Sequence, residues 1–354
     1  MGGTRMDILV FILTLGIIIT LHEFGHLIAA KIFGVYCREF SIGMGPKLTS
    51  FKGKETEYSL RAIPIGGYVA MAGEPDEDDR MPDNLPHERT LPGIKPWRRI
   101  IIYLAGIMMN ILLFIVAFTI FFSVVGIDNP EMTTSTVYQV QENSPAHLSG
   151  ILAGDTIVEI IKDGQSYPIS DFQDLQEVTS GNTQTVTYVI ERNNEKINVD
   201  LTPEYDDASD RYLIGVAFET PKQVLNVFEA FVHSIGFAWT FTVMIITALG
   251  NLFIGRGLDQ VGGPVAIFIE TSKVVDLGIV PIIAWIGQLS LNVGIFNALP
   301  IPALDGGRVL LTVAEIILGR PVNKDFENKL ITISFLILLA LIAIIVVNDI
   351  VGLF

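Results

Sequence analysis

The sequence predicts a polytopic α-helical membrane protein with about four transmembrane helices. It also predicts a β-rich, membrane-reentrant region on the cytoplasmic side and an inserted extracytoplasmic α+β domain. Half of the 354 residues are hydrophobic and the mean hydropathy is +0.51, which is more apolar than ordinary soluble domains. Several apolar runs are also about 20 residues long, the length that a helix needs to cross roughly 30 Å of hydrocarbon.

Charge and cysteine content exclude some classes of protein. The net charge of −15 argues against a nucleic-acid-binding protein, because such proteins need a basic surface. The single cysteine, Cys37, cannot form an internal disulfide, so nothing in the fold depends on an oxidising compartment. The apolar start after Arg5 resembles a signal peptide, but no small-residue cleavage site follows it. We therefore interpret it as a retained helix.

The spanning helices are predicted from the long apolar runs. Three apolar runs are long enough to span, and they lie at about 6–30, 99–126 and 328–347. A fourth run, at about 279–300, is interrupted by Asn292, Gly294 and Asn297, which a span tolerates where it packs inside a bundle. The run at about 228–254 is ambiguous, because it is apolar but carries Glu229 and His233.

Lysine and arginine are distributed unevenly between the two segments that connect the predicted spans. Segment 31–99 is rich in them, whereas 127–222 is dominated by Asp and Glu. An excess of Lys and Arg in short loops marks the cytoplasmic side, so we expect 31–99 inside and 127–222 outside. The 279–300 helix then ends on the cytoplasmic side, where the first helix also ends, only if 228–254 does not cross. We therefore predict an interfacial or re-entrant helix at 228–254 and leave a fifth crossing as the alternative.

The chain divides into three parts on this interpretation. Residues 1–126 form an N-terminal membrane part with two spans and a strand-rich region at 36–73. Residues 127–222 form the extracytoplasmic domain. Its core at 130–205 is predicted to contain strands at 137–140, 156–161, 184–191 and 195–202 and helices at 145–148 and 170–178. Residues 223–354 form a C-terminal membrane part with the interfacial helix and the third and fourth spans.

Residues His22-Glu23-Phe24-Gly25-His26 fit the pattern H-E-x-x-H inside the first predicted span. Positions i and i+4 share one face of a helix, so both imidazoles can bind one ion. The glutamate between them can act as a base toward water, and zinc suits two imidazoles with a carboxylate and one open position. Polar residues are costly in an apolar helix, which favours a functional site. The alternative is a buried polar cluster bonded to neighbouring helices.

A third metal ligand has to come from elsewhere, because no His or Glu follows at the short spacings that complete many soluble zinc sites. Asp305 is the best candidate, since it follows the 279–300 span in the run Asn297-Ala298-Leu299-Pro300-Ile301-Pro302-Ala303-Leu304-Asp305-Gly306-Gly307-Arg308. The prolines break the helix, and the glycines allow backbone to pack closely around the carboxylate. Asp-Gly-Gly is also an ordinary turn, which would be the preferred interpretation without the histidine pair.

Residues 22–26 together with 297–307 resemble the site-2 protease family of intramembrane zinc metalloproteases. That family has H-E-x-x-H in its first conserved helix and N-x-x-P-x-P-x-L-D-G in a later one, and both patterns are present here without a mismatch. The resemblance covers most of the chain and includes Gly43–Pro46, Gly66-Gly67-Tyr68, Met71-Ala72-Gly73-Glu74 and Gly263-Pro264-Val265. The order of the parts is similar to the bacterial branch of the family with one PDZ domain.

The resemblance implies a role for each matching residue. His22, His26 and Asp305 would bind zinc as the cofactor. Glu23 would be the general base and later the proton donor. Asn297 would hydrogen-bond the substrate backbone or the oxyanion, with a helix-packing amide as the alternative.

The second span departs from the family pattern, which has Ala-Gly-Pro before x-x-Asn. Here it reads Ala105-Gly106-Ile107-Met108-Met109-Asn110, which leaves the local bend open. Gly106 is expected to allow close helix packing. Asn110 is expected to bond to the surroundings of the metal or to the substrate. Gly66 and Gly67 complete the candidate substrate-binding residues, because an exposed strand edge there would supply main-chain partners for an unwound substrate.

The domain at 127–222 resembles a PDZ module through Ser144-Pro145-Ala146 and the run 149–160. PDZ domains add a peptide as an extra strand at a sheet edge. In the family that this chain resembles, they look more like a size filter that excludes substrates with bulky outer domains. Both interpretations stay open, and a peptide ligand is one expected partner.

The resemblance implies a multi-pass enzyme of the inner (plasma) membrane, with its active site toward the cytoplasm and its PDZ domain outside. It would cut a single-span membrane protein, such as an anti-sigma factor, or a remnant signal peptide, in regulated intramembrane proteolysis. Its partners would be that substrate and the lipid bilayer. One alternative is a non-catalytic, membrane-anchored PDZ scaffold, for which Glu23 and Asp305 would be dispensable. Another is a transporter, which the lack of a visible inverted repeat disfavours.

Overall fold

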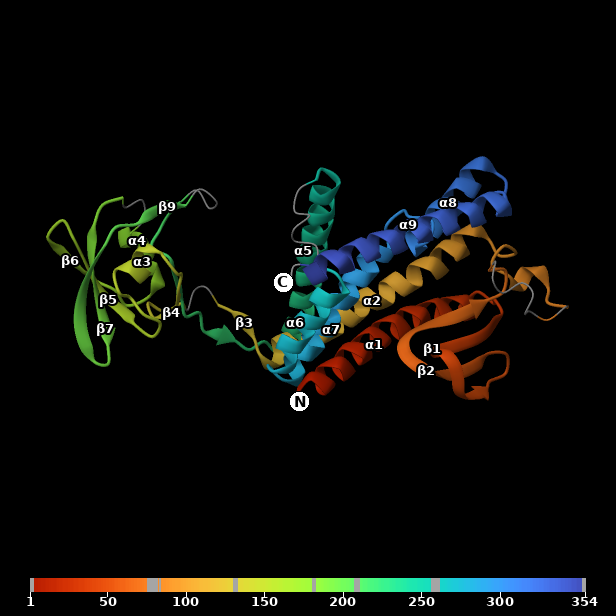
Figure 1. Ribbon diagram of the computed structural model, residues 1–354, viewed down its shortest axis with the longest axis horizontal. Helices are drawn as coiled ribbons and strands as arrows, with labels where there is room; N and C mark the ends of the chain where they lie inside the picture. Colours follow the sequence, from red (N-terminus) through yellow and green to blue (C-terminus); the bar gives the residue numbers. More distant parts are fainter. Residues whose placement is uncertain are drawn as a thin grey trace. The chain divides into compact units, whose positions relative to one another are not determined.

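The computed structural model describes residues 3–74, 82, 84–129, 133–179, 183–206, 211–255 and 262–351 (Figure 1). The chain forms two compact units. The helical unit combines Met1–Val124 with Asn226–Phe354, and the inserted unit consists of Val125–Leu225. All of the candidate catalytic and metal-binding residues lie in the helical unit.

Seven α-helices among the described residues build the helical unit. They are α1 (Gly3–Ile32), α2 (Pro96–Val124), α5 (Val227–Phe253), α6 (Pro264–Val275), α7 (Ile279–Asn297), α8 (Asp305–Leu318) and α9 (Lys324–Val351). Within the described residues, α1, α2, α5, α7 and α9 are long and apolar enough to cross a membrane. The run predicted to be interfacial thus forms one continuous helix, α5, and its position in the membrane stays a prediction beside the alternative of a fifth crossing. A short 3₁₀-helix, η2 (His87–Arg89), precedes α2.

Helices α2 and α7 pack antiparallel through small residues. A Cβ on Gly287 would meet the Cβ of Ala117 at 2.6 Å, and a Cβ on Gly294 would meet the Cβ of Asn110 at 3.1 Å. Rising residue numbers in α7 therefore meet falling numbers in α2. It follows that α7 starts at the end of the bundle where α2 stops, and that α7 ends toward the start of α2.

Helix α5 also runs antiparallel to α2. The rings of His233 and Phe122 lie 4.8 Å apart, and those of Phe241 and Phe114 lie 6.0 Å apart. Because α5 and α7 both begin near the end of α2, the chain enters both helices from the same end of the bundle.

Strands β1 (Cys37–Lys52) and β2 (Glu57–Met71) form the predicted strand-rich region beside the second half of α1 (Figure 1). Both strands bend, so their halves pair in four rows: Phe40 lies opposite both Val69 and Tyr58, and Tyr58 also lies opposite Phe51. The order across the sheet is 67–71, 37–42, 57–61 and 47–52, which places segment 67–71 at an edge.

Glycines form two of the bends in this sheet. Gly43 and Gly66 have φ angles of +82° and +85°, which glycine adopts far more readily than other residues. A Cβ on Gly43 would also lie 2.5 Å from the carbonyl oxygen of Ile63.

A buried carboxylate fixes the edge segment to the rest of the sheet. Glu39, which is 2 % exposed, accepts hydrogen bonds from Ser59 Oγ at 2.6 Å and from Arg61 Nη2 at 2.8 Å. Arg61 also donates to the hydroxyl of Tyr68 at 2.6 Å. Burial alone would raise the pKa of Glu39, but the hydrogen bonds from Ser59, Arg61 and Tyr68 lower it to about 2.

The inserted unit has a four-stranded antiparallel sheet in the order β6-β5-β7-β8. Its strands are β5 (Thr156–Lys162), β6 (Gln165–Pro168), β7 (Val186–Arg192) and β8 (Glu195–Leu201), and its helices are α3 (Pro145–Leu148) and α4 (Phe172–Thr179). The core gathers apolar side chains from these elements, among them Ile157, Ile160, Tyr188, Ile190 and Leu201. The predicted strands and helices of this segment are confirmed to within a few residues.

Short strands complete the inserted unit, and sequence reasoning found only one of them. The predicted strand is β4 (Val137–Val140), which pairs with β11 (Val216–Phe218). The others are β3 (Ile127–Asp128) with β12 (Lys222–Gln223), and β9 (Glu204–Asp206) with β10 (Arg211–Leu213).

Candidate metal centre

Helix α1 presents His22 and His26 on one face, as the i, i+4 spacing predicts. Both side chains are buried, and their Nε2 atoms lie 3.1 Å apart. Gly25 lies between them, and a Cβ there would meet the carbonyl oxygen of Ala105 at 2.4 Å. The glycine therefore lets α1 and α2 cross closely beside the histidines.

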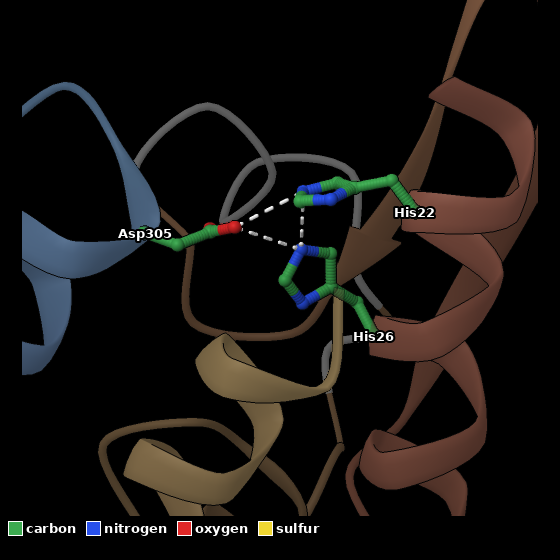
Figure 2. Close-up of side chains that lie close together, drawn as sticks. All are labelled: His22, His26 and Asp305. Atoms are coloured by element: carbon green, nitrogen blue, oxygen red, sulfur yellow. Dashed lines mark hydrogen bonds and ion pairs between the residues drawn. The ribbon is translucent and has the colours of Figure 1, made fainter. Parts of the chain in front are cut away.

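Asp305 reaches the histidines from the first residue of α8. Its Oδ2 atom lies 3.0 Å from His22 Nε2 and 3.3 Å from His26 Nε2 (Figure 2). Pro300 and Pro302 separate α7 from α8, because proline cannot continue a helix without losing a backbone hydrogen bond.

The two glycines after Asp305 are required by the turn that precedes it. A Cβ on Gly306 would lie 2.2 Å from the carbonyl oxygen of Ala298, and one on Gly307 would lie 2.1 Å from that of Ile301. The turn at 298–302 folds back over the start of α8. The Asp-Gly-Gly run therefore both ends this turn and positions the carboxylate of Asp305.

The three side chains fit a zinc ion by the spacing of their donor atoms. The donor atoms lie 3.0, 3.1 and 3.3 Å from one another. Ligands about 2.1 Å from a tetrahedral zinc lie roughly 3.4 Å apart, slightly farther than these donor atoms lie from one another. Oδ2 of Asp305 is buried and has no hydrogen-bond partner in the described part of the chain, although it faces both imidazoles. Such an orphaned anionic oxygen suits a cation between the three groups.

The hydrogen bond that Nδ1 of each imidazole makes decides whether Nε2 has a lone pair available for a metal ion. His26 Nδ1 lies 2.8 Å from the carbonyl oxygen of Ile102, which can only accept, so Nδ1 carries the hydrogen and Nε2 keeps its lone pair. His22 Nδ1 lies 3.1 Å from Nδ2 of Asn110, while Oδ1 of Asn110 is buried without a partner. Amide nitrogen and oxygen positions are interchangeable by rotation. With the amide rotated, Oδ1 accepts the Nδ1 hydrogen of His22, and both Nε2 atoms can bind metal.

A cavity of about 460 Å³ opens beside these donor atoms. Glu23 and Asn297 line it, as do Tyr68–Met71 of β2. Glu23 Oε2 accepts a hydrogen bond of 3.2 Å from the backbone N–H of Val69, so the catalytic carboxylate predicted from the sequence touches the edge of the sheet. The cavity thus places a carboxylate and an exposed strand next to the three donors.

The candidate substrate-binding residues lie apart from the cavity wall. Asn110 is fully buried and contacts His22, and neither Gly66 nor Gly67 is among the lining residues. A Cβ on Gly67 would meet the carbonyl oxygen of Ser41 at 2.6 Å, so this glycine allows the close pairing of β1 and β2. The substrate-binding role of all three residues stays a prediction.

The cavity wall also includes residues that were not singled out from the sequence, among them three polar ones. Tyr103, Glu74 and Arg308 lie on its wall, and Glu74 pairs with Arg308. Glu74 ends one of the runs that carry the family resemblance, and Arg308 directly follows another, so that signal was present for Glu74. Tyr103 had none, because an aromatic residue in an apolar span is ordinary.

The chain matches the family model described as peptidase family M50 over residues 10–341. A protein of Clostridium acetobutylicum named "Putative zinc metalloprotease" is 34% identical over 349 residues, covering 98% of this chain and 97% of its own. One of the same name from Fusobacterium nucleatum is 34% identical, covering 99% and 100%. "Probable protease eep" of Enterococcus faecalis is 28% identical, covering 97% and 98%. The chain therefore belongs to peptidase family M50, the site-2 protease family whose motifs it carries.

Proposed function

We propose that the protein is an intramembrane zinc metalloprotease that hydrolyses peptide bonds within transmembrane segments of single-span membrane proteins or remnant signal peptides. One observation carries the proposal. His22 and His26 lie on α1, a helix with the length and hydropathy of a span, and Asp305 brings a carboxylate to them in a cavity. Zinc as the metal follows from this donor set and from the names of the relatives.

His22, His26 and Asp305 would hold the zinc ion through Nε2, Nε2 and Oδ2. A bound zinc ion would supply Lewis acidity to a peptide carbonyl and to a water molecule. Asn110 and the carbonyl oxygen of Ile102 would hold the two imidazoles in the required tautomers.

Glu23 is the group that moves protons in this proposal. Its carboxylate lies in the cavity beside the three donors and can take a proton from water and return it to the amine leaving group. The Val69 N–H fixes Oε2, which leaves Oε1 for the proton. Asn297 lines the same cavity, where its amide N–H can donate to the oxyanion as charge develops.

The edge of β2 is suited to hold an unwound substrate. Segment 67–71 pairs with 37–42 on one side, and the Val69 N–H on its other side points toward Glu23. A helical segment has to unwind before its carbonyl can be attacked, and a strand edge supplies main-chain partners for the extended form. We propose that the substrate adds to this edge as a further strand.

For the inserted unit we propose a PDZ-type role in substrate selection. A cavity of about 940 Å³ lies between α4 and β11 and is lined by Phe172, Leu175, Tyr188 and Phe218. Among the described residues β11 pairs only with β4, and its free edge beside a cavity with aromatic lining residues favours binding of an extended peptide over exclusion by size alone. Direct binding of a single-span substrate's outer segment, lost on replacing Phe172 with Asp, would distinguish the two.

The entry of α5 and α7 from one end of the bundle supports a cytoplasmic position for the metal centre. Asp305 follows α7 and therefore lies toward the start of α2, which the basic segment 31–99 precedes. We propose an enzyme of the plasma membrane with the inserted unit outside.

Cleavage of a tagged single-span substrate by the purified protein in detergent tests the proposal, with Glu23→Gln beside it. Products cut within the apolar segment, formed by the unchanged protein and absent with the variant, are expected. Equal amounts of product from both proteins would exclude Glu23 as the base. A protein that holds no zinc and cuts nothing would favour the scaffold alternative.

A further inference from the structure

Glu74 and Arg308 form an ion pair between two elements that lie far apart in the sequence. Glu74 Oε1 lies 2.7 Å from Arg308 Nη1, and the two side chains are 16% and 30% exposed. The other oxygen of Glu74, Oε2, accepts a hydrogen bond of 3.1 Å from the backbone N–H of Met71. A single carboxylate therefore links the end of β2 to α8.

Each end of this link is attached to a part of the catalytic cavity. Met71 ends the edge segment 67–71, which carries the Val69 N–H bonded to Glu23. Arg308 lies three residues after Asp305, which is about one turn along α8. The guanidinium of Arg308 also lies over the ring of Tyr103, at 5.8 Å from its centroid. The ion pair thus spans from the strand edge to the helix that carries a proposed metal ligand.

A substrate held at a strand edge needs something to fix its register. Main-chain hydrogen bonds repeat every two residues, so a strand can move by two residues and keep the same face toward its neighbour. The peptide bond that reaches the metal centre then depends on how far that centre lies from the edge. A charge-assisted, half-buried hydrogen bond fixes the distance between the strand edge and the metal centre better than an ion pair at the surface, because solvent and salt screen the surface pair.

We infer that the Glu74–Arg308 pair is a positioning device that fixes the edge of β2 relative to the metal centre and so selects the bond that is cut. The inference rests on the proposed function, because it assumes that the substrate pairs with this edge. Glu74 and Arg308 are positioning residues, since they act through Met71 and Asp305.

The chain offers a matched control in the pair Glu55–Arg89. Arg89 donates two hydrogen bonds to Glu55, at 2.8 and 2.7 Å, and neither residue lines the cavity. Its side chains are more exposed, at 33% for Arg89 and 49% for Glu55. Removing this ion pair removes a similar charge pair without releasing the strand edge from α8.

The test compares the full-length protein with Arg308→Gln, Arg308→Lys and Arg89→Gln on one single-span substrate. Mass spectrometry of the products gives the cut sites, and kinetics give kcat and KM. We expect Arg308→Gln to spread cleavage over neighbouring bonds and to lower kcat by about tenfold to a hundredfold, because small misplacements are costly in catalysis. KM should stay within about twofold, since pairing at the edge itself remains. Arg308→Lys should restore the single cut, and Arg89→Gln should match the unchanged protein.

Two readouts do not depend on cleavage. Hydrogen exchange of the Met71 amide should become faster in Arg308→Gln. In the Glu23→Gln background, the dissociation constant for the substrate should not change with Arg308→Gln.

Three results would overturn the inference. One is the unchanged single cut in Arg308→Gln with slow Met71 exchange, which would leave the proposed function standing. Another is loss of zinc in both Arg308→Gln and Glu74→Gln, which would make the pair part of the metal centre's framework. The third is no cleavage by the zinc-loaded unchanged protein, which would reject the proposed function and this inference together.

Discussion

Gly106 lies where α2 meets the two imidazoles, and the variant Gly106→Ala tests how much the metal centre depends on that contact. A Cβ at this position would lie 2.5 Å from His26 Nε2 and 2.8 Å from Nε2 and Cε1 of His22. Carbon contacts settle at about 3.5–4.0 Å, so the rings or α2 would have to move by roughly 1 Å. Ligand distances in metal sites tolerate only about 0.2 Å. We therefore expect zinc affinity to fall by about a hundredfold or more, above the usual range for changes around the ligands.

The assay is competition for zinc against a chelator of known affinity, with the purified protein in detergent. Two alanine variants serve as controls. Gly236→Ala on α5 places its Cβ in open space, and Gly287→Ala meets Ala117 at 2.6 Å between α7 and α2. The first should bind zinc normally, and the second should lose stability before it loses zinc affinity. A folded Gly106→Ala protein with unchanged zinc affinity would refute the reasoning.

Asn110→Leu should lower zinc affinity by about tenfold to a hundredfold in the same competition. Asn110→Asp keeps a hydrogen-bond acceptor for His22 and should lose less zinc affinity. Equal losses of affinity in the two variants would contradict the orientation in which Oδ1 of Asn110 accepts from His22. The folded pKa of Glu39 is about 2, below its ordinary value of 4.5, so its stabilising contribution is complete above pH 4.5 and is lost as the pH falls toward 2. Unfolding by urea should show a loss of about 2 kcal/mol between pH 5 and pH 3 that Glu39→Gln lacks, and parallel profiles would exclude this role. Asp349 accepts hydrogen bonds from the Gly263, Val265 and Ala266 amides at 3.1, 3.2 and 3.2 Å, so it caps α6 from α9. Asp349→Ala should cost about 1 kcal/mol and lower the melting temperature, which an unchanged melting curve would contradict.

Features that depend on local spacing could be predicted from the sequence. The i, i+4 spacing places His22 and His26 on one face of any helix, and the helix itself follows from its apolar run. The break at Pro300 and Pro302 is equally local, because proline acts on its own neighbours. Strands β4, β5, β7 and β8 and helices α3 and α4 follow from alternation and turn residues in the same way, whereas β6 (Gln165–Pro168) was not predicted.

Contacts between distant residues could not be predicted in the same way. Asn110 and His22 are 88 positions apart, and Glu74 and Arg308 are 234 apart. Their meeting depends on how α1, α2 and α8 pack, which no local pattern encodes. Strands of two or three residues, such as β3 and β12, were missed because so few residues carry no periodic signal. The run at 228–254 stays ambiguous for a related reason, since its length suits both a span and an interfacial helix.

Zinc K-edge X-ray absorption on the purified, zinc-loaded protein tests most directly the claim that His22, His26 and Asp305 form the metal centre. We predict a first shell of light atoms only, at about 2.0–2.2 Å, with the outer-shell scattering of two imidazoles. Asp305→Ala should alter that first shell or abolish zinc binding. A sulfur shell at about 2.3 Å, or a spectrum that Asp305→Ala and His22→Ala both leave unchanged, would contradict the account.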